Sequence, residues 1–173
     1  MSNHITHEEI RGWLAGRLPQ DWFDGTPEVT IDREEITVVG ALAAPDLPDT
    51  ASAVERAAAG RGRVKGFRED TRERRMEIAR EIEHRTERKV AWGVTIEGER
   101  ILFSHLAVPV MTRLRQPERA VLDTLVDAGV ARSRSEALAW CVKLVGRNTD
   151  EWLGQLRAAM EEVERVRSAG PDA

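Results

Sequence analysis

Features typical of secreted and membrane-spanning proteins are scarce in this sequence of 173 residues. Its single cysteine, Cys141, excludes a disulfide framework within the chain. No apolar run approaches the roughly 18 residues that cross a bilayer. The N-terminal stretch MSNHITHEE lacks the basic start and the apolar core of a signal peptide. These absences predict a cytoplasmic protein that makes no contact with a membrane.

Motifs of catalysis and cofactor binding are also missing. The chain has no glycine-rich phosphate loop after a strand, no GxSxG and no HExxH. His4 and His7 are spaced as HITH and could ligate a transition metal, but a terminal HxxH pair is a weak signal. We therefore expect no enzymatic activity, no metal and no cofactor.

Charge is abundant and unevenly placed along the chain. The 26 basic and 30 acidic residues give a net charge of −4. Residues 60–90 contain 11 basic and 7 acidic residues, a net charge of +4, and residues 111–147 contain 7 and 4, a net charge of +3. Residues 1–59 carry −7. Local charge therefore says more about partners than the overall balance does.

The N-terminal region alternates between helical and strand patterns. Residues 6–18 predict a helix with a capping box from Thr6 to Glu9. Residues 29–31 and 36–42 predict two strands, and VAWGVTIEGERILFS predicts a second hairpin that turns at Glu97-Gly98. The order is α-β-β-α-β-β, which indicates an α+β fold with one four-stranded antiparallel sheet covered by helices on one face.

Between the two hairpins, residues 51–59 are alanine-rich and predict a helix. The glycines of GRGRVKG predict a break and a mobile loop. A long charged helix follows, with an apolar stripe of Met76, Ile78, Ala79 and Ile82. The basic loop is compatible with a phosphate backbone, although a solvated connection is the simpler interpretation.

Residues 109–145 predict a short strand followed by two helices. In the strand, Val110, Thr112 and Leu114 share one face, and Met111, Arg113 and Arg115 share the other. We expect the first set to face the core and the second to be exposed, with arginine donors suited to guanine edges or phosphates.

The two helices of this module have recognisable ends. Pro117 predicts the start of the first and Gly129 its end. Ser133 and Glu136 form a capping-box pattern at the start of the second, where polarised N–H groups favour an anion. Leu138, Val142 and Val145 are expected to point inward. A final amphipathic helix begins after Thr149.

Residues 108–146 resemble the ribbon-helix-helix family, the Arc and MetJ type of DNA-binding protein. The resemblance rests on the strand TRLR before Pro117 and on RSRSEAL at the start of the second helix. It implies an intertwined homodimer whose two-stranded ribbon enters the major groove of DNA and whose second helix anchors a phosphate. The candidate nucleic-acid-binding residues are Met111, Arg113, Arg115, Arg132, Ser133, Arg134 and Ser135.

The sequence predicts that the chain has three parts. Residues 1–106 form an α+β domain of unknown role, residues 107–147 form the strand-helix-helix module, and residues 148–173 form the C-terminal helix and a frayed tail. The leading function is a sequence-specific, homodimeric transcriptional regulator of bacterial type, with a ligand, a protein partner or neighbouring DNA on the N-terminal domain. A dimerisation and protein-interaction module without DNA binding is the alternative, and RNA or ribosome binding is a third.

Overall fold

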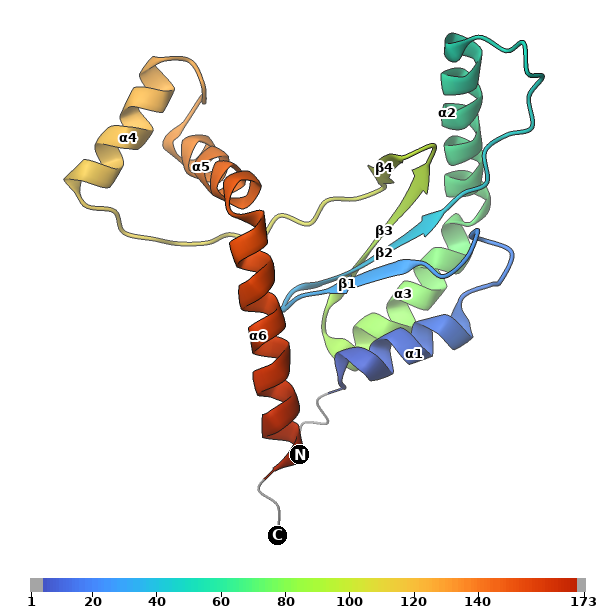
Figure 1. Ribbon diagram of the computed structural model, residues 1–173, viewed down its shortest axis with the longest axis horizontal. Helices are drawn as coiled ribbons and strands as arrows, with labels where there is room; N and C mark the ends of the chain where they lie inside the picture. The colour runs from blue at the N-terminus through green and yellow to red at the C-terminus, as the bar shows by residue number, and fades with distance from the viewer. Residues whose placement is uncertain (1–4, 171–173) are drawn as a thin grey trace. The chain divides into compact units, whose positions relative to one another are not determined.

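The computed structural model describes residues 5–170 and divides into two compact units, Met1–Pro109 and Val110–Ala173 (Figure 1). It confirms the expected α+β class. The elements of the first unit are α1 (His7–Arg17), β1 (Glu28–Ile31), β2 (Glu35–Ala41), α2 (Ala53–Asp70), α3 (Arg72–Thr86), β3 (Lys89–Ile96) and β4 (Glu99–Leu102). Those of the second are α4 (Gln116–Asp127), α5 (Arg134–Asn148) and α6 (Asp150–Ala169).

The four strands form one sheet in the order β1-β2-β3-β4, but the sheet is mixed. The two hairpins, β1–β2 and β3–β4, are antiparallel as expected, whereas the central pair is parallel from Glu35↔Lys89 to Ala41↔Thr95. The prediction of a wholly antiparallel sheet is therefore wrong. The α2–α3 pair carries the chain back across the sheet, so β3 enters in the same direction as β2.

The turn of the second hairpin follows the sequence prediction. Glu97 and Gly98 both adopt positive φ, 49° and 83°, between Ile96 and its partner Glu99. Two consecutive residues of positive φ define a turn whose twist matches that of the flanking strands. The capping box at Thr6 and Glu9 is confirmed in the same way, because both of its hydrogen bonds are present.

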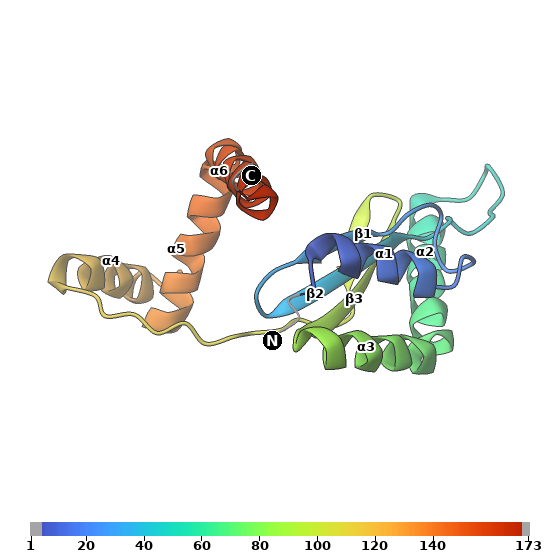
Figure 2. The same ribbon diagram turned by 90° about the horizontal axis from the view of Figure 1, so that it is seen from below.

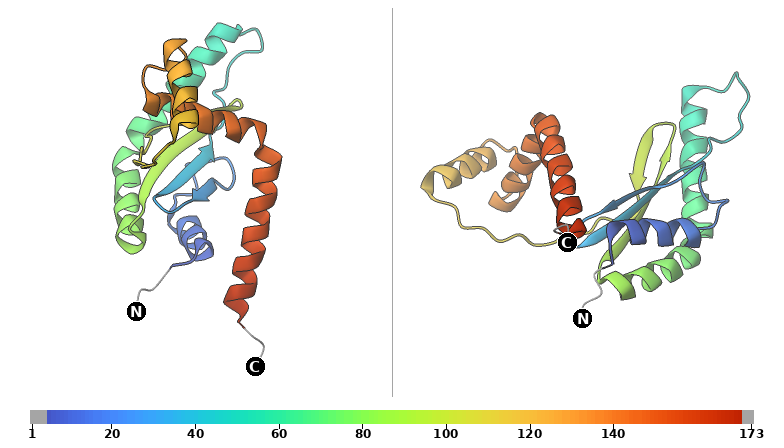
Figure 3. Two further views of the ribbon diagram at one scale, coloured as in Figure 1. Left: turned by 90° about the vertical axis from the view of Figure 1, so that its left-hand side faces the viewer. Right: turned by 60° about the horizontal axis from the view of Figure 1, so that its bottom comes forward.

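One face of the sheet carries the core, as alternation along the strands requires. Ile36 and Val38 of β2 and Trp92 of β3 point to this face. They pack against α1 and α3, which lie side by side across it (Figure 3). The buried helix residues of this cluster are Ile10, Leu14, Leu18, Ile78 and Ile82. Met76 is 39% exposed, so the expected stripe on α3 is narrower than its sequence suggested.

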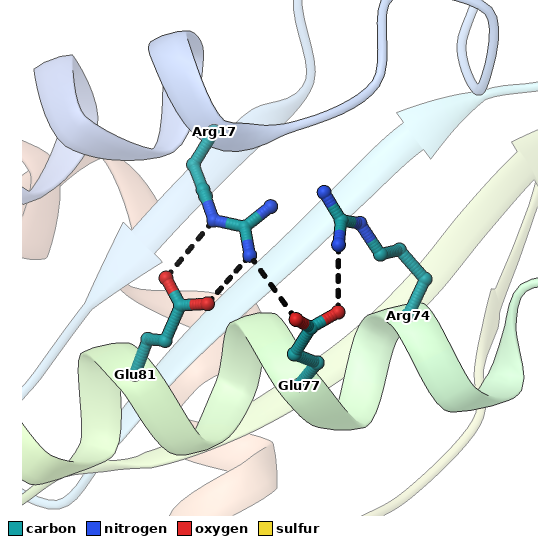
Figure 4. A network of polar contacts seen from close by, with 4 residues as sticks. All are labelled: Arg17, Arg74, Glu77 and Glu81. Atoms are coloured by element: carbon teal, nitrogen blue, oxygen red, sulfur yellow. Dashed lines mark hydrogen bonds and ion pairs between the residues drawn. The ribbon is translucent and has the colours of Figure 1, made fainter.

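An ion-pair network links α1 to α3 at the edge of this core (Figure 4). Arg17 Nε donates to Glu81 at 2.9 Å, and its terminal nitrogen also lies 3.7 Å from Glu77. Arg74 donates to the same Glu77 at 2.7 Å. The hydrogen bond from Arg17 lowers the pKa of Glu81 below its ordinary value. These contacts fix the two helices relative to each other.

Helix α2 runs through the segment that was expected to be a loop. Residues 60–66, GRGRVKG, lie within Ala53–Asp70. Gly60 is buried beside Ile96, and Val64 and Phe67 join a second core cluster with Leu42 and Val94. The burial of this face outweighs the low helix propensity of glycine, which costs about 1 kcal/mol per residue in a helix.

The second unit consists of three successive helices joined by short connections (Figure 2). The predicted helix ends are confirmed: Pro117 lies in the first turn of α4, and Gly129 follows its last residues with φ of 74°. The core of this unit is small, with Leu122, Ala131 and Ala137 as its buried residues. Among residues 5–170, no helix combines the length and the apolar character that crossing a membrane requires. His4 lies outside the described residues.

Candidate nucleic-acid interface

The segment Val110–Arg115 is extended but forms no strand. Within the described residues, positions 110–114 make no backbone-to-backbone hydrogen bond. A strand needs a neighbour for its N–H and C=O groups, and residues 5–170 provide none for this segment. The predicted strand is therefore absent from the isolated chain. Apart from the Leu114 carbonyl, which accepts from the Arg119 side chain, the backbone donors and acceptors of residues 110–114 are available to a partner.

The side chains of this segment only partly follow the expected alternation. Leu114 is half-buried against the small core of the second unit, and its carbonyl accepts a hydrogen bond from Arg119 at 2.8 Å. Val110 and Thr112, expected on the same face, are exposed. Met111 is 97% exposed. Because no strand of the described residues lies opposite this segment, Val110 and Thr112 stay exposed and only Leu114 is partly covered.

Arg113 and Arg115 are the unneutralised cations of the candidate site. Both are exposed, and neither forms an ion pair with any residue in the described part of the chain. They come from the segment before α4, and Arg115 is also the residue that precedes its first turn. Their guanidinium groups are therefore free to bind an external acceptor.

The start of α5 is capped, though not by the full box that the sequence predicted. Ser133 Oγ accepts from the N–H of Glu136 at 3.2 Å, which confirms the cap. The carboxylate of Glu136 accepts from Arg132, through its backbone N–H at 2.8 Å and its guanidinium at 3.1 Å, in place of Ser133. The side-chain and backbone hydrogen bonds from Arg132 lower the pKa of Glu136. This carboxylate adds a negative charge at the end of α5 where a phosphate would otherwise be favoured.

Arg134 is held by α4. Its Nε and one terminal nitrogen donate to the two oxygens of Asp123 at 2.6 and 2.8 Å. These hydrogen bonds lower the pKa of Asp123 and raise that of Arg134. A two-bond arginine–carboxylate pair is geometrically specific, so it fixes α5 against α4. Two of the predicted phosphate-binding cations, Arg132 and Arg134, therefore already have carboxylate partners.

A shallow groove brings some of the candidate residues together. Its volume is about 340 Å³, and it lies between the extended segment and the first turns of α4 and α5. Met111, Arg134 and Ser135 line it. The lining residues do not include Arg113, Arg115, Arg132 or Ser133. The predicted site is therefore spread over the surface of the second unit rather than gathered in one pocket.

Large apolar side chains lie exposed along α5 and α6. Helix α6 has no buried residue among Asp150–Ala169. Val142 and Val145 were expected to point inward but are 65% and 53% exposed, because the unit has too few elements to cover them. The exposed apolar residues of α6, here called the α6 stripe, are Trp152, Leu156, Met160, Val163 and Val166.

Sequence reasoning missed Asp123 as the partner of Arg134. The two residues belong to different helices, and no periodicity relates positions eleven apart across a turn. A second group, Arg68, Arg72 and Arg75 at the junction of α2 and α3, belongs to a basic run whose simpler interpretation was a solvated connection, so these arginines were not among the candidate site residues. The excess of basic residues over positions 60–90 was the available signal.

Comparison with known proteins covers both units. Residues 8–102 match the family model described as Rv1265-like protein, N-terminal domain, and residues 115–167 match the Mb1296 C-terminal domain. The chain is 63% identical over 160 residues to the uncharacterized proteins Mb1296 of Mycobacterium bovis and Rv1265 of Mycobacterium tuberculosis. The match covers 92% of this chain and 69% of each relative. No solved structure matches it.

These matches correct the family assignment made from the sequence. Neither matched model is a ribbon-helix-helix model, and residues 110–115 form no strand. The resemblance of residues 108–146 rested on TRLR as a strand, which does not form, and on the start of the second helix at RSRSEAL, a capping pattern that many unrelated helices share. The assignment to the ribbon-helix-helix family is therefore wrong. With its first unit matched almost from end to end and with close relatives along nearly its whole length, the chain belongs to the Rv1265-like family.

Proposed function

We propose that this chain is a cytoplasmic, homodimeric DNA-binding protein that regulates transcription through its second unit. The observation that carries the proposal is that this unit leaves both backbone groups and apolar side chains without partners. Its buried core consists of Leu122, Ala131 and Ala137. A domain of about 60 residues is marginally stable even with a full core, and this unit has a small one. A second copy is the simplest source of the missing contacts.

Two features support a dimer. The backbone groups of residues 110–113 make no hydrogen bond to a described residue, and pairing them with the same segment of a second copy would satisfy the groups of both copies. The α6 stripe repeats along one side of its helix, which is typical of a helix that packs on another. An exposed stripe of this kind marks an interaction surface.

The free arginines support DNA as the ligand. In a paired strand, Met111, Arg113 and Arg115 would share the face away from Leu114, because side chains alternate. Arginine donates two hydrogen bonds to guanine in the major groove. Residues 111–147 carry a net charge of +3, which favours a polyanion although the whole chain is acidic.

The start of α5 would bind a backbone phosphate in this arrangement. Ser133, Arg134 and Ser135 present the N–H groups of the first helical turn. Arg132 and Arg134 would exchange their carboxylate partners for phosphate oxygens on binding. Phosphate contacts position a protein on DNA, whereas base contacts supply its sequence preference.

A second candidate function is protein binding without DNA. The carboxylates of Asp123 and Glu136 already neutralise Arg134 and Arg132, and residues 148–173 carry a net charge of −3. In this case the second unit only dimerises, and the acidic ends bind another protein. The two functions differ in salt dependence, because release of counterions weakens phosphate binding steeply as salt rises.

Gel-shift titration of the full chain on genomic DNA fragments at low salt tests the proposal. We expect selective binding, and Arg113→Ala should weaken it by about 1–3 kcal/mol while relaxing the sequence preference. Arg33→Ala removes an equal charge from the β1–β2 turn of the first unit and serves as the control. If no fragment binds above the nonspecific level, the DNA proposal is wrong and the protein-binding function takes its place.

A further inference from the structure

The junction of α2 and α3 contains a buried arginine without a counter-ion. Arg75 is only 7% exposed. Arginine is almost never fully buried unless it is paired, because removing its charge from water costs several kcal/mol. Among residues 5–170, no carboxylate lies within ion-pair distance of its guanidinium group. Its positive charge therefore remains uncompensated in the described chain.

Neutral acceptors fix the orientation of this guanidinium. Nε donates to Thr71 Oγ1 at 2.9 Å, and Nη2 donates to the backbone carbonyl of Arg68 at 2.7 Å. Thr71 Oγ1 in turn donates to the carbonyl of Phe67 at 2.6 Å. Nη1 makes no hydrogen bond to a described residue. The guanidinium group is thus held in place, its Nη1 can still donate hydrogen bonds, and no carboxylate neutralises its charge.

The charged neighbours of Arg75 are also cations. Its guanidinium carbon lies 4.9 Å from the centre of the Phe103 ring, and that of Arg68 lies 5.5 Å from the same centre. Burial, with the charges of Arg68 and Arg72, lowers the pKa of Arg75 to about 10. Neither Arg68 nor Arg72 is in an ion pair with a described residue. No described carboxylate therefore forms an ion pair with any of the three arginines at this junction.

We propose that Arg68, Arg72 and Arg75 bind the phosphoryl group of a small phosphorylated molecule. A doubly charged phosphoryl group supplies the missing negative charge and has oxygens for several N–H donors. The planar guanidinium fork matches phosphate geometry better than an ammonium group does. Thr71 and Phe103 position the arginines and do not themselves contact the ligand.

The surrounding charges favour a compact phosphate over a nucleic-acid backbone. Glu69, Asp70 and Glu73 are exposed beside the three arginines in sequence. Carboxylates this close in sequence disfavour an extended polyanion, whereas a single phosphoryl group needs only the arginines. The near burial of Arg75 also restricts access to a small group. The site lies in the first unit and does not depend on the proposed DNA-binding surface.

Isothermal titration of the full chain with inorganic phosphate and with pyrophosphate tests this site. We expect saturable binding and a rise in Tm, because a ligand that binds the folded state stabilises it. Arg72→Gln should raise the dissociation constant at least about tenfold, which corresponds to the loss of one charge-assisted contact. Arg72 is exposed, so this variant should fold normally. Arg33→Gln is the matched control and should bind like the wild type.

Arg75→Lys adds a second measurement that separates binding from folding. Lysine keeps the positive charge but lacks the planar guanidinium group that donates two parallel hydrogen bonds. We therefore expect the variant to bind pyrophosphate more weakly and still to unfold cooperatively. Absence of saturable binding up to about 10 mM, or equal binding by Arg72→Gln and Arg33→Gln, would overturn the proposal. Binding to an oligonucleotide that neither phosphate nor pyrophosphate displaces would also overturn the proposal. DNA binding lost through Arg113→Ala with pyrophosphate binding intact would show that the two sites are separate.

Discussion

Asp123 shows how one carboxylate can control a candidate site. It accepts two hydrogen bonds from Arg134 and lowers the positive charge that the start of α5 presents to an anion. Glu136 does the same for Arg132. The arginines of the candidate site are therefore of two kinds: Arg113 and Arg115 form no ion pair with a described residue, whereas Arg132 and Arg134 are paired. Of these four, Arg113 and Arg115 could bind an external anion without first breaking an ion pair.

Replacing Asp123 with asparagine should release Arg134. We expect Asp123→Asn to bind DNA more tightly and to show a steeper loss of affinity with salt, because one more cation contacts phosphate. Fluorescence anisotropy over a salt series measures both quantities. Asp127→Asn, an equal change in charge at the end of α4, is the control. Unchanged affinity and slope in Asp123→Asn would place Arg134 outside the DNA surface.

At the scale of elements, the connection between α1 and β1 lies so close to β2 that it restricts the residue at position 40. A Cβ atom added to Gly40 would overlap the ring of Phe23. Phe23 contacts both core clusters of the first unit, and its ring packs against Trp22 and Phe67. The ring therefore cannot move aside without disturbing its aromatic neighbours. Glycine at this position lets the α1–β1 connection lie against the sheet.

Gly40→Ala should therefore destabilise the first unit. We expect the free energy of unfolding to fall by about 1–3 kcal/mol, as for overpacking elsewhere in protein cores. Urea denaturation followed by tryptophan fluorescence measures the change. Gly12→Ala is the control, because no atom lies within 4 Å of the added Cβ and alanine favours a helix over glycine. Equal stability of the two variants would show that the loop repacks freely.

The ion pair between α1 and α3 predicts acid sensitivity. The pKa of Glu81 is lowered in the folded state, chiefly by its hydrogen bond to Arg17. A lowered folded pKa contributes stability above the ordinary value of 4.5, and this stability is lost as pH falls through the folded pKa.

Thermal unfolding of Glu81→Gln and the wild type between neutral pH and pH ~3 measures this contribution. We expect the difference in Tm to be largest near neutral pH and to shrink below the ordinary pKa of glutamate. Glu87→Gln, at the end of α3, controls for the change in net charge. A difference that stays constant over the whole range would contradict the coupling.

At the scale of the whole molecule, the two units differ in how completely each buries its own apolar side chains. The first has a four-stranded sheet, three helices and two core clusters. The second buries three residues and exposes the α6 stripe. Its stability should therefore depend on protein concentration, as it does when folding and association are coupled.

Changes in the α6 stripe should dissociate the proposed dimer. We expect Leu156→Asp with Met160→Asp to give a monomer in sedimentation equilibrium and to lower the Tm of the second unit, because charges cannot be buried at the interface. Arg157→Asp alters charge beside the stripe without removing an apolar contact and serves as the control. A wild type that is monomeric at micromolar concentration would refute the dimer itself.

Local sequence rules were sufficient for much of the secondary structure. The capping residues Thr6 and Ser133, the turn at Glu97-Gly98 and the helix end at Gly129 each act through hydrogen bonds or dihedral angles within a few residues. The amphipathic pattern of α6 is equally local. These features determined the α+β class and the limits of most elements from the sequence alone.

Tertiary structure decided what depends on partners distant in the sequence. The parallel pairing of β2 with β3 follows from the path of α2 and α3, and α2 continues through its glycines because Val64 and Phe67 are buried. The pairing of Arg134 with Asp123 and the burial of Arg75 beside Phe103 likewise join separate elements. Local patterns do not encode such contacts, because the free energy of burial and charge pairing depends on which surfaces the whole fold brings together.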